Sequence, residues 1–174
     1  SIHKAQKAMD RYDYTEAIKI LRKAIDKEKD VEKAVPMLAE CYRRQHDIFN
    51  TRAWYSRAVT LPEVKPETYL YYAKALQASG DYGAARNFFL KYDSVSTDKK
   101  GSFFARNCDS VTGNWKDLPP AYEVKTVDKI KTDFSDFGPV FYKGKVVFAS
   151  DYAYGPGKGK TYGWPGRGYL DMVS

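Results

Sequence analysis

Histidine and cysteine are scarce in this 174-residue chain, which contains two of each. The histidines, His3 and His46, have no Cys or His partner at the spacing typical of metal ligands. Two histidines also give no basis for a Ser/His/Asp or Cys/His catalytic arrangement. The cysteines are too few for a disulfide framework, and Cys41 has the apolar neighbours of a small core residue. We therefore predict no metal, no cofactor and no enzymatic activity.

Long apolar runs and blocks of one charge are missing too. No stretch approaches the ~20 apolar residues that a membrane-spanning helix needs, and no five basic residues stand together. The net charge of +7 and the pI of about 9.2 still raise nucleic acid or an anionic membrane as partners. Because acids stand among the basic residues, as in the stretch 23–33, a mixed-charge helix surface is the favoured interpretation. We predict no nucleic-acid partner and keep nucleic-acid binding as an alternative.

Two further patterns resemble ligand sites without matching them. The glycine-rich run 155–160 is too short for a phosphate-binding loop, and no helix follows it, so we expect a mobile loop between strands. Four acids of the C-terminal part do not follow the spacing of a calcium-binding loop, and we expect them to cap turns and strand ends. These acids are Asp133, Asp136, Asp151 and Asp171.

What the chain does contain is an internal period of 34 residues. Three columns show it: Ala5, Ala39 and Ala73; Asp13, Asp47 and Asp81; and Tyr14, Ile48 and Tyr82. Small residues allow the two helices of a hairpin to approach closely. An Asp before a helix can accept its free N–H groups and suits the positive helix end. The period is the length of one tetratricopeptide helix–turn–helix unit, and such stacks usually bind proteins.

Further columns fall in the second helix of each repeat. They are Ala17, Thr51 and Ala85; Leu21, Tyr55 and Phe89; and Ala24, Ala58 and Tyr92. Together the columns resemble the tetratricopeptide pattern over about 90 residues. Lys4, Thr51 and Tyr92 depart from it, and an irregular helical bundle with chance spacing is the alternative. Gly80 suits a left-handed turn, and Pro62 and Pro66 bracket the break before the third repeat.

Beyond the repeats, the composition changes twice. Residues 98–110 are predicted to form one capping helix with an apolar face of Phe103, Phe104 and Cys108. After a connector, 140–142 and 146–149 read as two strands of a hairpin, and 168–173 as a third strand. We expect a mainly α fold: a tetratricopeptide solenoid of three repeats plus a capping helix at 1–110, a connector at 111–132, and a small β segment at 133–174.

The β segment carries a resemblance to a known family. The stretches 133–142, 147–151, 162–164 and 169–172 look like the opening of a β-propeller blade. Repeats followed by such a blade are similar to OmpA-family proteins of Bacteroidota, which have tetratricopeptide repeats, a propeller and a peptidoglycan-binding domain. The resemblance implies a periplasmic scaffold at the outer membrane, associated with type IX secretion and gliding. A lipid anchor is likewise only implied by the family.

Two surfaces are the candidate sites. In a tetratricopeptide stack the first helix of each hairpin lines the inner groove, and the 34-residue period gives the residues that would face it. The arginines among them suit an acidic or C-terminal-carboxylate partner. These groove residues are Gln6, Met9, Glu40, Arg43, Arg44, Lys74 and Gln77. An ordinary solvated face is the alternative. The second candidate is an aromatic patch of Tyr152, Tyr154, Tyr162 and Trp164. The favoured alternative is that these rings pack onto the capping helix or onto the rest of a propeller, which this sequence does not include.

The functional expectation is a non-catalytic protein–protein interaction scaffold in the periplasm. Its repeats would dock onto an outer-membrane or periplasmic component of the secretion or gliding machinery, and peptidoglycan would be reached only through domains outside this sequence. The alternative is a generic tetratricopeptide adaptor in the cytoplasm that holds a peptide tail.

Overall fold

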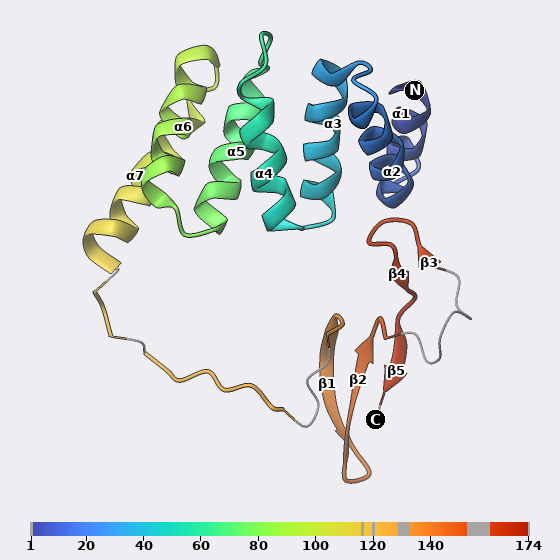
Figure 1. Cartoon of the computed structure of the whole chain (residues 1–174). Coiled ribbons are helices and arrows are strands. Elements are labelled where there is room, and N and C mark those ends of the chain that lie inside the picture. The colour runs from blue at the N-terminus through green and yellow to red at the C-terminus, as the bar shows by residue number, and fades with distance from the viewer. Residues whose placement is uncertain (1, 116, 120, 129–132, 153–160, 174) are drawn as a thin grey trace. The chain divides into compact units, whose positions relative to one another are not determined.

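The computed structural model describes residues 2–115, 117–119, 121–128, 133–152 and 161–173. The glycine-rich run and Tyr154 of the aromatic patch therefore lie outside the described residues. The chain is mainly helical and ends in a small antiparallel sheet (Figure 1).

The chain divides into a helical unit, Ser1–Pro119, and a sheet unit, Pro120–Ser174. The described helices are α1 (Ile2–Asp10), α2 (Tyr14–Asp26), α3 (Val31–Arg44), α4 (Ile48–Ala58), α5 (Pro66–Ala78), α6 (Tyr82–Val95) and α7 (Lys100–Ser110), followed by the π-helical turn Val111–Trp115. Each helix packs mainly against the helix before it and the helix after it in the chain. Figure 1 shows the resulting row of helices.

Three helix starts are built in the same way. Asp13, Asp47 and Asp81 each accept a hydrogen bond from the backbone N–H three residues further on, at 3.1, 2.9 and 3.3 Å. The cap satisfies an N–H group that the helix itself cannot pair, which typically stabilises a helix by about 1 kcal/mol. The capping role predicted for these residues is confirmed.

The residue before each capping Asp turns the chain. Tyr12, His46 and Gly80 have φ values of +60°, +58° and +79°. Left-handed backbone conformations are uncommon for residues other than glycine. Tyr12 and His46 are therefore strained at this position, whereas Gly80 is not. His46 is exposed in its turn.

The core lies along the inside of the row. Ala5, Ala39 and Ala73 have no exposed surface, and they belong to α1, α3 and α5. The second-helix columns are buried as well: Ala17, Leu21, Ala24, Thr51, Tyr55, Ala58, Ala85, Phe89 and Tyr92. Burying one large apolar side chain contributes about 1.5–3 kcal/mol, so Leu21 and Phe89 in these columns each stabilise the helical unit. Cys41 is fully buried as predicted, and burial raises the pKa of its thiol to about 12.

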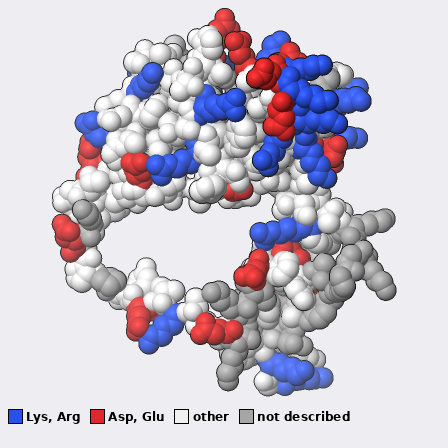
Figure 2. Space-filling model, viewed as in Figure 1, with Lys and Arg blue, Asp and Glu red and all other residues white. Residues whose placement is uncertain are grey.

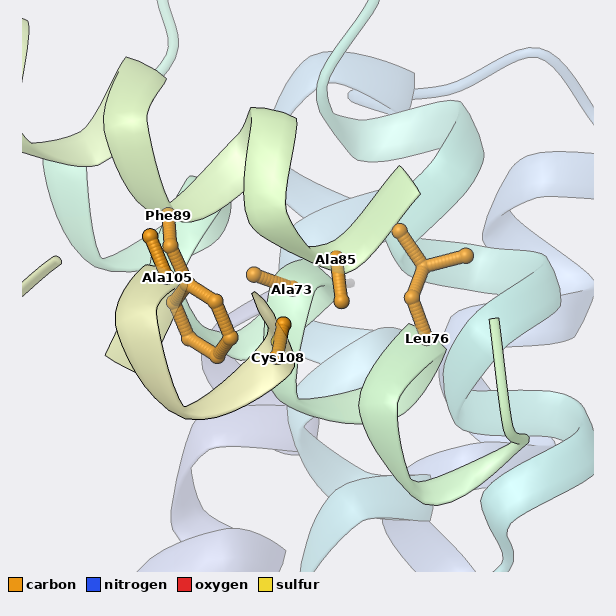
Figure 3. Packing of buried hydrophobic residues seen from close by; sticks show 6 residues of the cluster. All are labelled: Ala73, Leu76, Ala85, Phe89, Ala105 and Cys108. Carbon is orange, nitrogen blue, oxygen red and sulfur yellow. The ribbon is translucent and has the colours of Figure 1, made fainter. Parts of the chain in front are cut away.

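The last three helices share one packed cluster. Figure 3 shows Phe89 of α6 over the turn of α7 that carries Ala105 and Cys108, with Ala73 of α5 and Ala85 close by. The capping-helix prediction is correct for Cys108, which is 1% exposed. It is wrong for Phe103, which is 55% exposed because α7 has packing partners on the α6 side.

The start of α7 is held by a carboxylate from α6. Asp93 is buried and accepts hydrogen bonds from the backbone N–H groups of Gly101 and Ser102, at 2.6 and 2.7 Å, and from the Ser102 hydroxyl. A Cβ at Gly101 would lie 2.0 Å from the Phe89 carbonyl oxygen. Helices α6 and α7 therefore touch so closely at this point that only glycine fits.

The sheet unit contains five described strands. Strands β1 (Asp136–Tyr142), β2 (Lys145–Ser150) and β5 (Asp171–Val173) form an antiparallel sheet in the order β1-β2-β5. Strands β3 (Thr161–Tyr162) and β4 (Arg167–Gly168) form a separate pair. The β1–β2 hairpin is as predicted, and Lys143 and Gly144 make its turn with φ of +48° and +78°.

The single strand predicted at 168–173 is wrong, because the chain there divides between two sheets. Gly168 pairs back on Thr161, whereas Asp171 pairs with Ser150 of β2. A tight turn, in which the Gly166 N–H donates to the Tyr162 carbonyl at 2.8 Å, pairs β4 with β3 and not with β2.

Among the four acids expected to cap turns, Asp151 shows that role most clearly. It is 7% exposed, and its Oδ1 accepts the Ser135 backbone N–H at 2.9 Å. Arg167 Nη1 lies 3.5 Å from Asp151 Oδ2 and donates to the Ser135 hydroxyl at 3.2 Å. Asp151 thus ties the end of β2 to β4 and to the segment before β1.

Candidate docking groove

The seven predicted groove residues belong to the first helix of each hairpin. Gln6 and Met9 lie on α1, three charged residues lie on α3, and Lys74 and Gln77 lie on α5. Their exposure differs in a useful way. Gln6, Arg44 and Lys74 are exposed, while Met9, Glu40, Arg43 and Gln77 are half-buried.

Four hollows lie along these helices. We name the N-terminal hollow, of about 430 Å³, by its walls Gln6, Met9, Asp10, Tyr14, Glu40 and Arg44. The middle hollow, about 250 Å³, has Met9, Met37, Glu40, Tyr55, Lys65 and Tyr71 in its walls. The cationic hollow, about 230 Å³, has Arg43, His46, Ile48, Thr51, Tyr71 and Lys74. The fourth hollow, about 420 Å³, has Ile2, Pro36, Met37, Ala58 and Val64 beside the charged residues Glu32, Lys33, Glu63 and Lys65.

At the centre of these hollows, Glu40 binds two arginines of its own helix. Arg43 donates through Nε and Nη2 to the two carboxylate oxygens, both at 2.6 Å, and Arg44 Nε donates at 2.7 Å. Tyr55 of α4 adds a hydroxyl donor at 3.1 Å. The Arg43 guanidinium also lies 4.1 Å from the centre of the Tyr71 ring. Glu40 and Tyr71 thus fix the position of the Arg43 guanidinium, and Tyr55 helps to hold Glu40.

Electrostatics keep this cluster ionised. Burial acts to raise the pKa of the Glu40 carboxyl, but the hydrogen bonds from Arg43 and Arg44 outweigh it, and the pKa lies below its ordinary value. The hydrogen bond to Glu40 raises the pKa of Arg43 despite burial. Burial, and then the Glu40 charge, raise the pKa of Tyr55. The tyrosine therefore stays a neutral donor, and one carboxylate and two guanidinium groups carry a net charge of +1.

The predicted preference of this groove for an acidic or C-terminal-carboxylate partner stays a prediction, but an acid of the chain itself already binds both arginines. Glu40 already occupies the bidentate face of Arg43 and the Nε of Arg44. Bidentate pairing is the geometry in which Arg binds carboxylates best, so an internal acid has the place that we assigned to a partner. The spacing Glu40, Arg43, Arg44 is the helical i, i+3, i+4 pattern, so the sequence contained the signal for this cluster.

Lys74 and Gln77 of α5 both contact side chains of α7. The Lys74 ammonium lies 5.0 Å from the centre of the Phe104 ring, and Gln77 Nε2 donates weakly to Cys108 Sγ at 3.8 Å. Within the described part of the chain, Lys74 pairs with no carboxylate, whereas Arg43 and Arg44 do. Lys74 is thus the groove cation whose charge is not locally balanced.

Thr51 lies in the wall of the cationic hollow, a position that the sequence analysis did not predict for it. It is 5% exposed, and the described residues supply no hydrogen-bond partner for its Oγ1. A buried hydroxyl without a partner costs about 1–3 kcal/mol. The signal was the Thr in a column that otherwise holds alanine.

The rings of the predicted aromatic patch belong to separate pairs. Tyr152 lies edge-on to Phe134 with ring centres 4.7 Å apart, and the Tyr162 ring lies 6.0 Å from that of Tyr169. Trp164 is half-buried. Tyr152 and Tyr162 thus have ring partners that the sequence did not indicate.

Charged side chains on the helical unit are mixed in sign. Figure 2 shows Lys and Arg gathered over the end of the unit that carries α1 and α2, with Asp and Glu among them. In the described part of the chain, no three His, Cys, Asp or Glu side chains come together in a way that could hold a metal ion. Across the same residues, no helix has the length and apolar character to span a bilayer.

The fold and the groove define a mainly helical protein with a small antiparallel sheet and a row of hollows along one helix layer. Searches against protein-family models, curated proteins and solved structures found no match to this chain.

Proposed function

We propose that this chain is a non-catalytic docking scaffold, and that its helical unit is a stack of three tetratricopeptide repeats closed by α7. The observation that carries the proposal is the equivalence of positions 34 residues apart. Ala5, Ala39 and Ala73 are each fully buried in the first helix of a hairpin. An aspartate caps the second helix in each case. Stacks of this kind present an extended surface for other proteins.

The groove supports a docking role by its shape and chemistry. Its hollows follow one another along α1, α3 and α5, and aromatic and methionine side chains stand among charged ones. Surfaces of that mixed character are typical of protein interfaces. The resemblance of the C-terminal part to a propeller blade extends the proposal to an OmpA-family protein of Bacteroidota, similar to the member called PorE. Its place would be the periplasm, at the outer membrane, with the type IX secretion or gliding machinery.

A cross-linking experiment tests the docking role. A photo-reactive phenylalanine at Gln6, which is exposed in the groove, is compared with one at Lys19 on α2, whose side chain is 71% exposed. In cells that make the protein, we expect a discrete adduct with another envelope protein from the Gln6 position and none from Lys19. Identical adducts from both positions, or none from Gln6, would overturn a docking role for the groove.

Cell fractionation tests the location. The proposal predicts the protein in the periplasmic and outer-membrane fractions. Recovery in the cytoplasm would favour the alternative of a generic tetratricopeptide adaptor that binds a peptide tail, and it would remove the link to secretion or gliding.

A further inference from the structure

The first hairpin has an outer side that takes no part in the groove. On α1, Gln6 lines the N-terminal hollow together with Glu40 of α3, so that side of the helix faces the groove. Lys4, Lys7 and Arg11 are spaced i, i+3 and i+7, a spacing that places side chains in one stripe along a helix. All three are exposed, and at 3.6 residues per turn their stripe lies on the side of α1 turned away from Gln6.

A second basic stripe lies on α2. Gln45, at the end of α3, donates to the Thr15 hydroxyl at 3.2 Å, so the side of α2 that carries Thr15 faces α3. Lys23 and Lys27 are one helical turn apart, exposed, and on the side of α2 turned away from α3. Because α1 packs against α2, the two stripes border the same helix pair. We call them together the basic face, made of Lys4, Lys7, Arg11, Lys23 and Lys27.

The positive charge of the basic face is not balanced by neighbouring acids. In the part of the chain that the structure describes, none of its side chains forms an ion pair. Among the exposed acids of the two helices, Asp10 accepts a hydrogen bond from Gln6 on the groove side, and Glu16 lies 3.9 Å from Lys19. Asp26 remains as the exposed acid of α2 that opposes the face. Positive charge is therefore in excess, in agreement with the gathering of Lys and Arg at this end of the unit in Figure 2.

The basic face offers charge without a hollow. None of the four hollows has a side chain of the basic face in its wall. Protein partners usually insert anchor side chains into pockets, and single-stranded nucleic acids stack their bases on aromatic rings. The exposed ring of this hairpin, Tyr12, already lies edge-on to Tyr14 with ring centres 6.4 Å apart. A lipid surface needs neither feature, because its phosphate headgroups attract basic side chains by charge alone.

We propose that the basic face of α1 and α2 binds the phosphate headgroups of an anionic lipid bilayer. Each basic side chain near such a surface strengthens binding about fivefold, and salt weakens the attraction by screening it. The inference goes beyond the proposed docking function and uses a different side of α1. The groove therefore stays open to a protein while the basic face lies on the bilayer.

Sedimentation with vesicles tests the inference on the full chain. The protein is mixed with vesicles of phosphatidylcholine alone, or of phosphatidylcholine and phosphatidylglycerol in equal parts, at about 0.05 M and about 0.5 M NaCl. We expect binding to the anionic vesicles at low salt, a large loss at high salt, and no binding to phosphatidylcholine. Equal binding to both compositions, or no binding to the anionic vesicles at low salt, would overturn the inference.

Removal of charge from α1 gives the sharper measurement. The triple variant Lys4→Gln, Lys7→Gln and Arg11→Gln should lower the partition coefficient on anionic vesicles about a hundredfold, at about fivefold for each base removed. The replaced side chains are exposed, so circular dichroism at 222 nm should be unchanged. Binding of this variant at the wild-type level would overturn the assignment of the face.

A second triple variant is the matched control. Arg57→Gln, Lys91→Gln and Arg106→Gln together remove the same charge from exposed positions on α4, α6 and α7. We expect the control to lose less than about tenfold, because its charges lie outside the basic face. A loss equal to that of the α1 variant would mean that net charge, and not this face, holds the protein on the vesicles.

A nucleic acid is the competing anion, and competition separates the two. Single-stranded and duplex oligonucleotides are added to vesicle-bound protein at the same total phosphate concentration as the vesicles. We expect the protein to stay with the vesicles, and its release by either oligonucleotide would overturn the assignment to lipid. If cross-linking from Gln6 fails while vesicle binding succeeds, the docking role falls and the membrane face stands.

Discussion

The two units of the chain differ in how completely they cover their apolar side chains. The helical unit hides Leu21, Leu38 and Phe89 completely. In the described part of the sheet unit, Phe148 is the one large apolar side chain that is buried. A row of helices covers each hairpin with the next, whereas two or three short strands cannot cover both faces of their own sheet.

The pairing register shows what the sheet leaves uncovered. Phe137, Ala149 and Met172 stand opposite one another in the three strands, so their side chains share one face. Phe137 and Met172 are 50% and 65% exposed. The helical unit therefore contains its own core, while the described sheet leaves apolar surface open.

The difference between the units can be tested at Phe89 and Phe148, one buried phenylalanine in each unit. Phe89→Ala should lower the free energy of unfolding of the helical unit by about 3–5 kcal/mol, since it empties a fully buried site. Phe148→Ala should leave the helical transition unchanged. Urea unfolding followed by circular dichroism at 222 nm measures both. Equal shifts in the two variants would show that the units unfold as one body.

Gly101 and Gly144 test the backbone of the helical unit and of the sheet unit, respectively. Gly101→Ala should destabilise the helical unit by about 1–3 kcal/mol, because the added Cβ would meet the Phe89 carbonyl at 2.0 Å. Gly144 has nothing within 4 Å of its added Cβ but a φ of +78°, so alanine there strains the hairpin turn and spares the helices. Gly83→Ala, in open space, is the control for mutation within a helix. A neutral Gly101→Ala would contradict the close contact of α6 and α7.

Asp93, which caps the start of α7 from α6, should make the free energy of unfolding depend on pH. Burial acts to raise the pKa of Asp93, but the hydrogen bonds from Ser102 and Gly101 lower it by a larger amount. The pKa of Asp93 in the folded protein therefore lies below its ordinary value. A depressed carboxyl stabilises above its unfolded pKa of about 3.9, and this contribution is lost as the pH falls through the folded value. Asp93→Asn should therefore cost about 2 kcal/mol at pH 7.

The difference between wild type and Asp93→Asn should stay constant from about pH 8 to pH 5 and shrink below about pH 4. Chemical unfolding at each pH measures it. A difference that is the same at pH 3 and pH 7 would mean that the charge of Asp93 does not hold the start of α7.

The smallest expected effect is a gain. Thr51→Val removes the buried hydroxyl that has no partner among the described residues, and should raise the free energy of unfolding by up to about 1 kcal/mol. Thr15→Val is the matched control, because the Thr15 hydroxyl accepts a hydrogen bond from Gln45 at 3.2 Å and its loss should destabilise. Destabilisation by Thr51→Val of the same size would show that its hydroxyl is paired.

The sequence predicted where the groove residues lie better than it predicted which side chains they contact. The period placed Gln6, Arg43 and Lys74 on the first helix of each hairpin, and all three line hollows there. It did not reveal that Tyr55, from the next helix, joins Arg43 on Glu40. A period assigns a residue to a helix face, but a side chain's partners depend on which helices pack beside it.

The amino-acid sequence determined the helix starts and the buried columns of this protein, because both depend on residues close in the chain. Asp13 caps an N–H group three residues away, and the spacing of alanines follows from one repeat length. Only the tertiary structure decided that Asp93 begins α7 and that Phe103 faces outward. Those outcomes depend on how closely two helices approach, and packing of the whole unit sets that distance.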